Sequence, residues 1–66
     1  MDELQVLTNA VRGLPEEQRQ AFTLHYIFEL GLAEIARRLH MTPEHAEHCI
    51  AAAFATLREK LASYFE

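Results

Sequence analysis

Residues 32–44, which read LAEIARRLHMTPE, decide the fold. Their apolar positions recur at intervals of three and four, which predicts a helix of two or three turns that buries one face. Those positions are Leu32, Ile35, Ala36 and Leu39. After a connection of about three residues, Thr42 offers a hydroxyl N-cap and Pro43 fits the first turn of another helix. A short helix, a tight turn and a longer helix are typical of a helix-turn-helix, although a plain four-helix bundle would use the same connections.

Helical spacing continues on both sides of this stretch. It predicts one helix over residues 2–12, a second from Pro15 to about Phe28, and a last helix from Pro43 nearly to the C-terminus. The predicted inner faces comprise Leu4, Leu7 and Val11; Phe22 and Tyr26 with Ala21 and Ile27; and Ala46, Ile50, Ala53, Leu57, Leu61 and Tyr64. The chain is therefore predicted to be all-α, with a single small four-helix domain over residues 1–66 that contains a helix-turn-helix.

The composition limits the class of protein. Ten carboxylates against six Lys and Arg give the 66 residues a formal net charge of −4, whereas strong nucleic-acid binders usually carry a basic patch. Cys49 is the only cysteine, so packing alone must hold the fold. No apolar run approaches the roughly 20 residues of a membrane span, and acidic residues follow Met1. Neither a membrane span nor a signal peptide is expected, and a cytoplasmic location is predicted.

Three stretches carry a resemblance to a known family: residues 14–22 (LPEEQRQAF), 24–26 (LHY) and 32–39 (LAEIARRL). In this order they resemble the fourth conserved region of bacterial sigma factors, particularly the extracytoplasmic-function type. Residues 57–61 (LREKL) resemble its leucine-rich tail, so the resemblance extends from about Leu4 to Leu61. The C-terminal domain of LuxR-type regulators shares the pattern of residues 32–39. The resemblance implies that the last helix binds the −35 promoter element and that another surface contacts a flap of RNA polymerase.

The last helix departs from that family where DNA contact depends on charge. The family usually places several Lys, Arg, Ser or Thr residues on its exposed face, but residues 43–56 read PEHAEHCIAAAFAT. No Lys or Arg occurs between Arg38 and Arg58. Each missing phosphate contact removes one released counterion, and Glu44 and Glu47 would repel phosphates unless they accepted bonds from base amino groups. Weak or lost DNA binding is therefore predicted.

Apolar residues extend beyond the core-facing stripe of the last helix. They are Ala51, Ala52, Phe54 and Ala55. A helix that is apolar nearly all round is usually covered on more than one side, so a partner protein or a second copy of the chain is predicted to bind this face. The alternative is that the alanines only raise helix propensity on a solvated face. Phe54 favours contact, because a large aromatic side chain gains most from burial.

The same helix also carries residues that bind metals in other proteins. His45, His48 and Cys49 share one helical face, and His40 or a glutamate would be needed to complete a zinc tetrahedron. Zinc sites usually combine ligands from two elements, and neither a Cys-x-x-Cys nor a His-Glu-x-x-His pattern is present. Solvated helix residues are therefore predicted here, with no metal or cofactor. No third group orients a nucleophile, so no enzymatic activity is predicted.

Two hypotheses for function follow from the sequence. The first is a transcription-initiation module that acts mainly through contact with RNA polymerase, an anti-sigma factor or a second copy of itself, with promoter DNA bound weakly and no membrane contact. The second is a genuine promoter-binding domain, in which arginines contact phosphates and polar side chains read base edges. Its contact residues would be Arg37, Arg38, Thr42, Glu44, His45, Glu47, His48 and Arg58.

Overall fold

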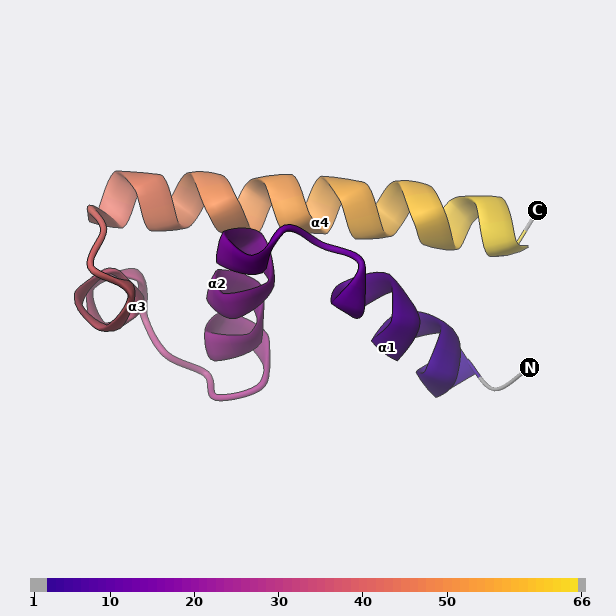
Figure 1. The fold of residues 1–66 in the computed structure, drawn as a ribbon, viewed down its shortest axis with the longest axis horizontal. Helices are drawn as coiled ribbons and strands as arrows, with labels where there is room; N and C mark the ends of the chain where they lie inside the picture. Colours follow the sequence, from indigo (N-terminus) through magenta and orange to yellow (C-terminus); the bar gives the residue numbers. More distant parts are fainter. Residues whose placement is uncertain (1–2, 66) are drawn as a thin grey trace.

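The computed structural model describes residues 3–65, with side chains described through Ser63. Four helices follow one another along the chain: α1 (Glu3–Arg12), α2 (Glu16–Tyr26), α3 (Leu32–Leu39) and α4 (Pro43–Phe65) (Figure 1). No strand occurs among the described residues, so the predicted all-α fold with a helix-turn-helix is confirmed. Asp2, predicted to start the first helix, and the side chain of Tyr64, predicted on the inner face of the last helix, lie outside the described residues.

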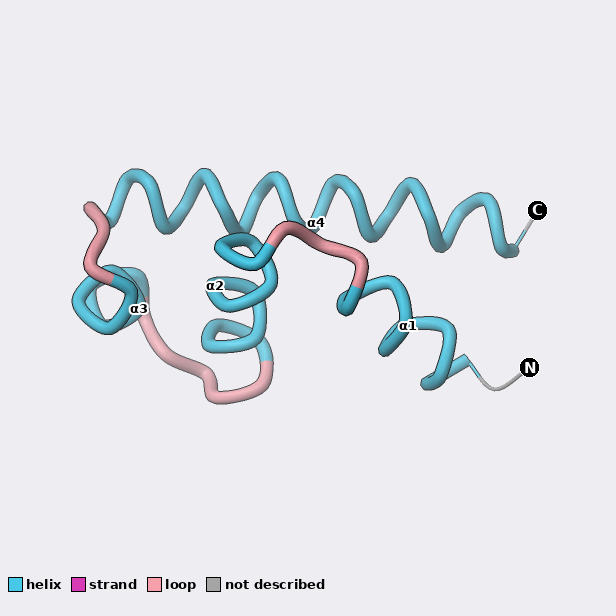
Figure 2. Tube along the Cα trace, viewed as in Figure 1, coloured by secondary structure: helices cyan, strands magenta, loops and turns pink. Residues whose placement is uncertain are grey.

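The long helix α4 is the support on which the other helices pack. The three shorter helices all lie on one side of it, with α3 at its N-terminal end, α2 in the middle and α1 beside its C-terminal half (Figures 1 and 2). Short loops at residues 13–15, 27–31 and 40–42 connect them (Figure 2). The described domain measures 37 × 18 × 16 Å, so it is one helix long and two helices thick.

Two clusters of buried side chains lie along α4. The first joins α2, α3 and the first half of α4, and consists of Ala21, Ile35, Ala36, Ala46, Cys49 and Ile50. The second joins the end of α1 and the loop after it to the second half of α4, and consists of Ala10, Leu14, Ala53 and Leu57. The predicted inner faces of α3 and α4 are therefore confirmed at Ile35, Ala46 and Leu57. Cys49, predicted to be a solvated helix residue, is buried in the first cluster.

The predicted inner face of α1 was wrong in its first turns. Leu4 and Leu7 are exposed, whereas Ala10 is buried against the second cluster. The reason is the direction of α1. The C-terminal end of α1 lies closest to α4, and the helix slants away from α4 toward its own N-terminus (Figure 1). Spacing places the leucines correctly on one face, but the packing of α1 leaves Leu4 68% and Leu7 37% exposed.

Helix α2 ends two residues earlier than predicted, at Tyr26. The N–H groups of Ile27 and Phe28 both donate to the carbonyl of Thr23, and Glu29 then adopts a left-handed conformation with φ 56°. Ile27 and Phe28 are consequently exposed in the loop, so the inner face predicted for Ile27 was also wrong. Tyr26 is likewise more exposed than predicted, since it lies in the last turn of the helix.

None of the described helices combines the length and the apolar character that crossing a membrane requires.

Candidate functional site

The turn between α3 and α4 sets the direction of α4, which as the second helix of the helix-turn-helix is its recognition helix. His40 is left-handed, with φ 57° and ψ 48°, and its N–H donates to the carbonyl of Ala36. The N–H of Met41 donates to the same carbonyl at 2.9 Å. Thr42 Oγ1 then accepts a hydrogen bond from the N–H of His45 at 3.0 Å, which caps α4. Thr42, predicted as a DNA contact, thus also holds the start of the recognition helix.

The two arginines at the end of α3 share one carboxylate. Arg38 Nε donates to Glu34 Oε2 at 2.8 Å, and Arg37 contacts both oxygens of Glu34 through Nε and Nη2. The hydrogen bond from Arg38, followed by that from Arg37, holds the pKa of Glu34 below its ordinary value. Both guanidinium groups are exposed, but a DNA phosphate would have to compete with Glu34 for each of them. The predicted phosphate contacts are therefore partly neutralised within the domain.

The outer surface of the first turns of α4 is polar and contains carboxylates instead of cations. Its exposed side chains are Glu44, His45, Glu47 and His48. The rings of His45 and His48 stack with their centroids 6.5 Å apart. With neutral imidazoles, only Glu44 and Glu47 of these four residues carry a formal charge. Both charges are negative, which opposes the approach of a phosphate backbone.

An apolar groove opens where the end of α2 and the start of α3 meet the middle of α4. We call it the α4 groove, and it is lined by His25, Tyr26, Leu32, Glu47, Ile50, Ala51, Phe54, Ala55 and Arg58. The rings of Tyr26 and Phe54 stack, with their centroids 6.2 Å apart and their planes at 26°. Phe54 still has 47% of its surface exposed. The groove therefore offers an apolar wall to solvent on the helix that would normally face DNA.

The predicted protein-contact residues divide between two sides of α4. Ala51, Phe54 and Ala55 line the α4 groove, whereas Ala52 is half-buried and does not line it. Two members of the predicted DNA-contact set, Glu47 and Arg58, border the same groove.

Two residues of the α4 groove were missed because their spacing assigned them to the core. Tyr26 is the last residue of α2 and Leu32 is the first residue of α3. A position at the end of a helix is the sequence signal that would have placed them at a rim, because side chains there are covered by fewer neighbours.

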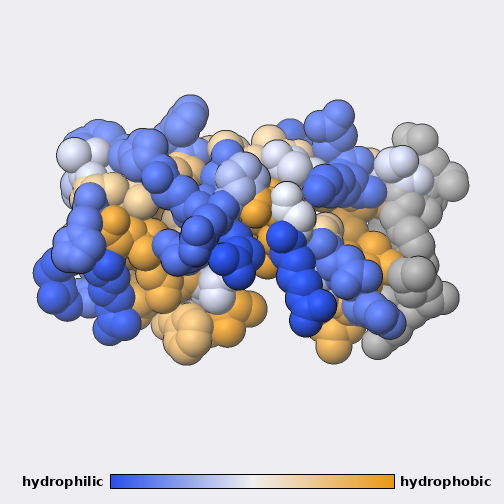
Figure 3. Space-filling view, in the orientation of Figure 1, coloured by the Kyte–Doolittle hydropathy of each residue, from blue (hydrophilic) through white to orange (hydrophobic). Residues whose placement is uncertain are grey.

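A second apolar surface lies between α1 and α2. It is lined by Leu4, Leu7, Thr8, Val11, Arg12, Arg19, Phe22, Thr23 and Ile27. Figure 3 shows hydrophobic surface along the lower edge of the molecule, over α1 and over the loop after α2. This surface is flanked by the guanidinium groups of Arg12 and Arg19, whereas the α4 groove is bordered by one acidic and one basic residue.

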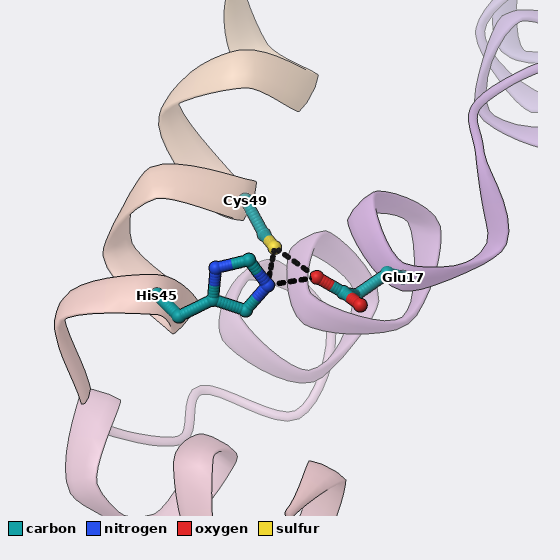
Figure 4. A group of neighbouring side chains, drawn as sticks. All are labelled: Glu17, His45 and Cys49. Atoms are coloured by element: carbon teal, nitrogen blue, oxygen red, sulfur yellow. Dashed lines mark hydrogen bonds and ion pairs between the residues drawn. The ribbon is translucent and has the colours of Figure 1, made fainter. Parts of the chain in front are cut away.

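Three side chains of different chemistry meet where the start of α2 packs on α4 (Figure 4). Cys49 Sγ donates to Glu17 Oε1 at 3.1 Å, and Nε2 of His45 forms a hydrogen bond with the same oxygen. Sγ of Cys49 lies 3.7 Å from Nε2 of His45. The structure thus brings together two of the three residues whose spacing had suggested metal ligands, with Glu17 in place of His48.

Burial and hydrogen bonding shift the ionisation of this cluster. Desolvation, followed by the hydrogen bond to Glu17, raises the pKa of Cys49 to about 11. The hydrogen bond from Cys49, followed by that of His45, holds the pKa of Glu17 below its ordinary value. At neutral pH the cysteine is consequently a thiol that donates to a carboxylate, which is the opposite of an activated nucleophile. Glu17 was not predicted, because 28 and 32 residues separate it from His45 and Cys49 and no local spacing links them.

Comparison with known proteins identifies the family to which this chain belongs. Neither the curated proteins nor the solved structures contain a match to this chain. The family model described as sigma-70, region 4, matches residues 4–57, which include nearly all of α1, all of α2 and α3, and α4 as far as Leu57. The match thus includes the turn of the helix-turn-helix, the second apolar surface and every residue of the α4 groove except Arg58. The chain belongs to the sigma-70 region 4 family.

Proposed function

We propose that this chain is a transcription-initiation module that acts mainly through contact with another protein and binds promoter DNA weakly. The partner is RNA polymerase, an anti-sigma-type protein or a second copy of the chain, and the site of action is the cytoplasm. One observation carries the proposal: the exposed side of the recognition helix is an apolar groove bordered by a carboxylate where a promoter-binding helix would carry cations.

The composition of the α4 groove favours protein as its partner. Aromatic side chains are enriched at protein interfaces, and a stacked pair such as Tyr26 and Phe54 presents a large apolar area with little conformational freedom to lose. The neighbouring alanines, Ala51 and Ala55, allow a partner backbone or side chain to approach α4 closely. Contact with this groove would remove apolar surface from water at about 25 cal/mol for each Å².

The charges of the domain argue against strong DNA binding. The three arginines of the rival contact set include two that share Glu34, so only Arg58 has no ion pair among the described contacts. Glu44 and Glu47 add negative charge near the expected path of the duplex. Phosphate contacts supply most of the non-specific affinity for DNA. The small number of available cations therefore predicts weak association with DNA.

A genuine −35-binding domain is the second candidate, and the intact helix-turn-helix favours it. Thr42 caps α4, and the side chains of Glu44, His45, Glu47 and His48 remain exposed along its first turns. A glutamate can accept a hydrogen bond from the amino group of cytosine, so base reading is chemically available even without cations.

A salt titration separates the two candidates. Binding to a −35-type duplex is measured by fluorescence anisotropy from low to physiological salt, with an unrelated duplex as control. The proposal expects weak binding at low salt and no preference for the promoter sequence. Micromolar or tighter affinity for the −35-type duplex, falling with salt by a log–log slope of about −0.9 per contacted phosphate, would contradict it.

The protein contact is tested with Phe54→Glu. A charge in the α4 groove is expected to weaken self-association or binding to purified core RNA polymerase by about 30-fold, the loss typical of a central interface residue. Ser63→Glu is the matched control, because it adds the same charge to an exposed position of α4 that does not line the groove. Circular dichroism checks that both variants fold. Equal binding by Phe54→Glu and the wild type would exclude the groove as the contact surface.

A further inference from the structure

The cluster of Glu17, His45 and Cys49 has the arrangement of a three-ligand metal site. One potential ligand atom from each residue lies within 4.8 Å of the others. The ligands come from two helices, since Glu17 lies in the first turn of α2 and the other two lie one turn apart on α4. Sites of this kind connect separate elements, which is the feature that the sequence spacing alone did not provide.

The separations of the ligand atoms suit a small tetrahedral ion. Bonds of about 2.3 Å to sulfur and about 2.0 Å to nitrogen place tetrahedral ligands about 3.5 Å apart. The distance from Cys49 Sγ to His45 Nε2 is 3.7 Å, and that from Cys49 Sγ to Glu17 Oε1 is 3.1 Å. The carboxylate of Glu17 must move away from Nε2 of His45 to reach a tetrahedral separation, and because Glu17 is half-exposed its side-chain torsions can supply that movement.

The chemistry of the three donors selects the metal. A thiolate, an imidazole and a carboxylate are the side chains that bind zinc, whereas magnesium and calcium prefer oxygen alone. Glu17 accepts hydrogen bonds from the other two members of the cluster, and no arginine or lysine occupies its carboxylate among the described contacts. The carboxylate is therefore held in place by its fellow ligands.

The position of the cluster allows an ion to enter. Cys49 is 3% exposed and forms the floor, while Glu17 and His45 are about half-exposed and form the rim. A water molecule can occupy the fourth position from the solvent side. The backbone of His45 is fixed by the cap from Thr42, so the rim belongs to a well-ordered helix start. None of the three residues lines the α4 groove.

We propose that Glu17, His45 and Cys49 bind one zinc ion, which links the start of α2 to the start of the recognition helix. The site does not depend on the proposed protein contact, because none of its residues lines the α4 groove. On binding, the thiol of Cys49 loses its proton to solvent and the ion replaces that proton between the sulfur and Glu17, so the thiolate, the carboxylate and the imidazole of His45 become its ligands. Zinc thereby stabilises the packing of α2 on α4.

The test uses the whole chain, reduced and stripped of metal, and zinc alone as the ligand. Competition with a chromophoric chelator is expected to show one zinc ion per chain, with a Kd below about 10 µM. Cobalt substitution is expected to produce thiolate-to-metal charge-transfer absorption. Zinc is also expected to raise the melting temperature of the wild type, because it binds the folded chain.

Conservative variants identify the ligands. Glu17→Gln and His45→Asn change half-exposed side chains and are each expected to weaken zinc binding by at least about tenfold. Glu16→Gln and His48→Asn are the matched controls, since they make the same substitutions at neighbouring exposed positions and are expected to leave affinity within about twofold. Cys49→Ser is expected to remove the charge-transfer absorption, and circular dichroism checks its fold.

Three outcomes would overturn the proposal. The first is the absence of zinc binding by the wild type. The second is equal affinity in the wild type and His45→Asn, and the third is a loss in His48→Asn as large as that in His45→Asn. These results are read from the wild type and from variants of exposed residues, so none depends on whether Cys49→Ser folds.

Discussion

The first half of α4 is enclosed by α2 and α3, whereas its second half is covered mainly by α1, with Phe22 of α2 at the edge. Helices α2 and α3 close over Ala46 and Ile50, and Ile35 at the centre of this cluster is completely buried. On the other half, α1 contributes Ala10 and leaves Leu7 at 37% exposure. The two halves therefore use the same helix but bury unequal amounts of apolar surface.

This difference indicates which side chains stabilise the fold and which remain available for contact with a partner. The helix-turn-helix half is held mainly by buried side chains such as Ile35 and Ala46, and of its cluster only Ile50 also lines the α4 groove. The α1 half keeps Leu4, Leu7 and Val11 beside a surface shared with α2, where added apolar contact is still available. A small domain buries a limited fraction of its surface, so apolar residues that remain exposed together usually serve an interface.

The largest expected effect comes from the centre of the enclosed half. Ile35→Ala removes a completely buried side chain and is expected to lower the free energy of unfolding by about 2–5 kcal/mol, a large share of what a domain this small possesses. Leu7→Ala, in the α1 half, is expected to cost less than about 1 kcal/mol because part of the side chain already contacts water. Urea unfolding followed by circular dichroism measures both.

The comparison between the two halves fails if the two alanine variants are equally destabilised. Equal losses would mean that α1 contributes as much to the folded state as the helix-turn-helix does. If Leu7→Ala lowers the free energy of unfolding only when a partner is present, the comparison is sharpened, because the exposed face of α1 is then assigned to binding.

The turn of the helix-turn-helix provides the next effect. His40 is left-handed at the end of α3, a conformation that costs a non-glycine residue about 1 kcal/mol or more. His40→Gly is therefore expected to raise the free energy of unfolding by about 1 kcal/mol. His48→Gly, the same substitution within α4, is expected to lower it by about 1 kcal/mol, because glycine is a poor helix former. Thermal melts of the two variants give opposite signs if the strain lies in the turn.

Local signals explain how much of the fold could be predicted. The start of α4 is encoded by neighbouring residues, because Thr42 caps it and Pro43 suits its first turn. The buried face of α3 follows from spacing, since Ile35 and Ala36 lie on one side of a short helix. These features depend on residues a few positions apart, so the sequence alone predicts them.

The missed features depend on how helices meet. Spacing shows that Leu4 and Leu7 share a face, but only the slant of α1 decides that this face is uncovered. The pairing of Tyr26 with Phe54 and the contact of Glu17 with Cys49 each join α2 to α4 across many residues. Such contacts are set by packing angles, which helical periodicity does not specify. The apolar side of α4 was predicted, whereas the helices that complete its groove were not.

The smallest expected effect concerns the exposed ion pairs of α3. Because Arg38 and Arg37 lower the pKa of Glu34 in the folded chain, the carboxylate contributes stability at pH values above its ordinary pKa near 4.5. That contribution is lost as the pH falls through the lowered value, where the carboxylate takes up a proton.

Glu34→Gln removes this titration and leaves every other carboxylate unchanged. Its melting temperature is expected to lie at most a few degrees below that of the wild type at pH 7, since exposed pairs are weak, and the difference is expected to vanish in acid. Thermal melts of both proteins between neutral and acid pH measure the difference directly. A difference that stays constant with pH would show that Glu34 stabilises α3 through packing or helix propensity. In that case Arg37 and Arg38 would be more available to phosphates than the pairing implies, and the case for weak DNA binding would rest on α4 alone.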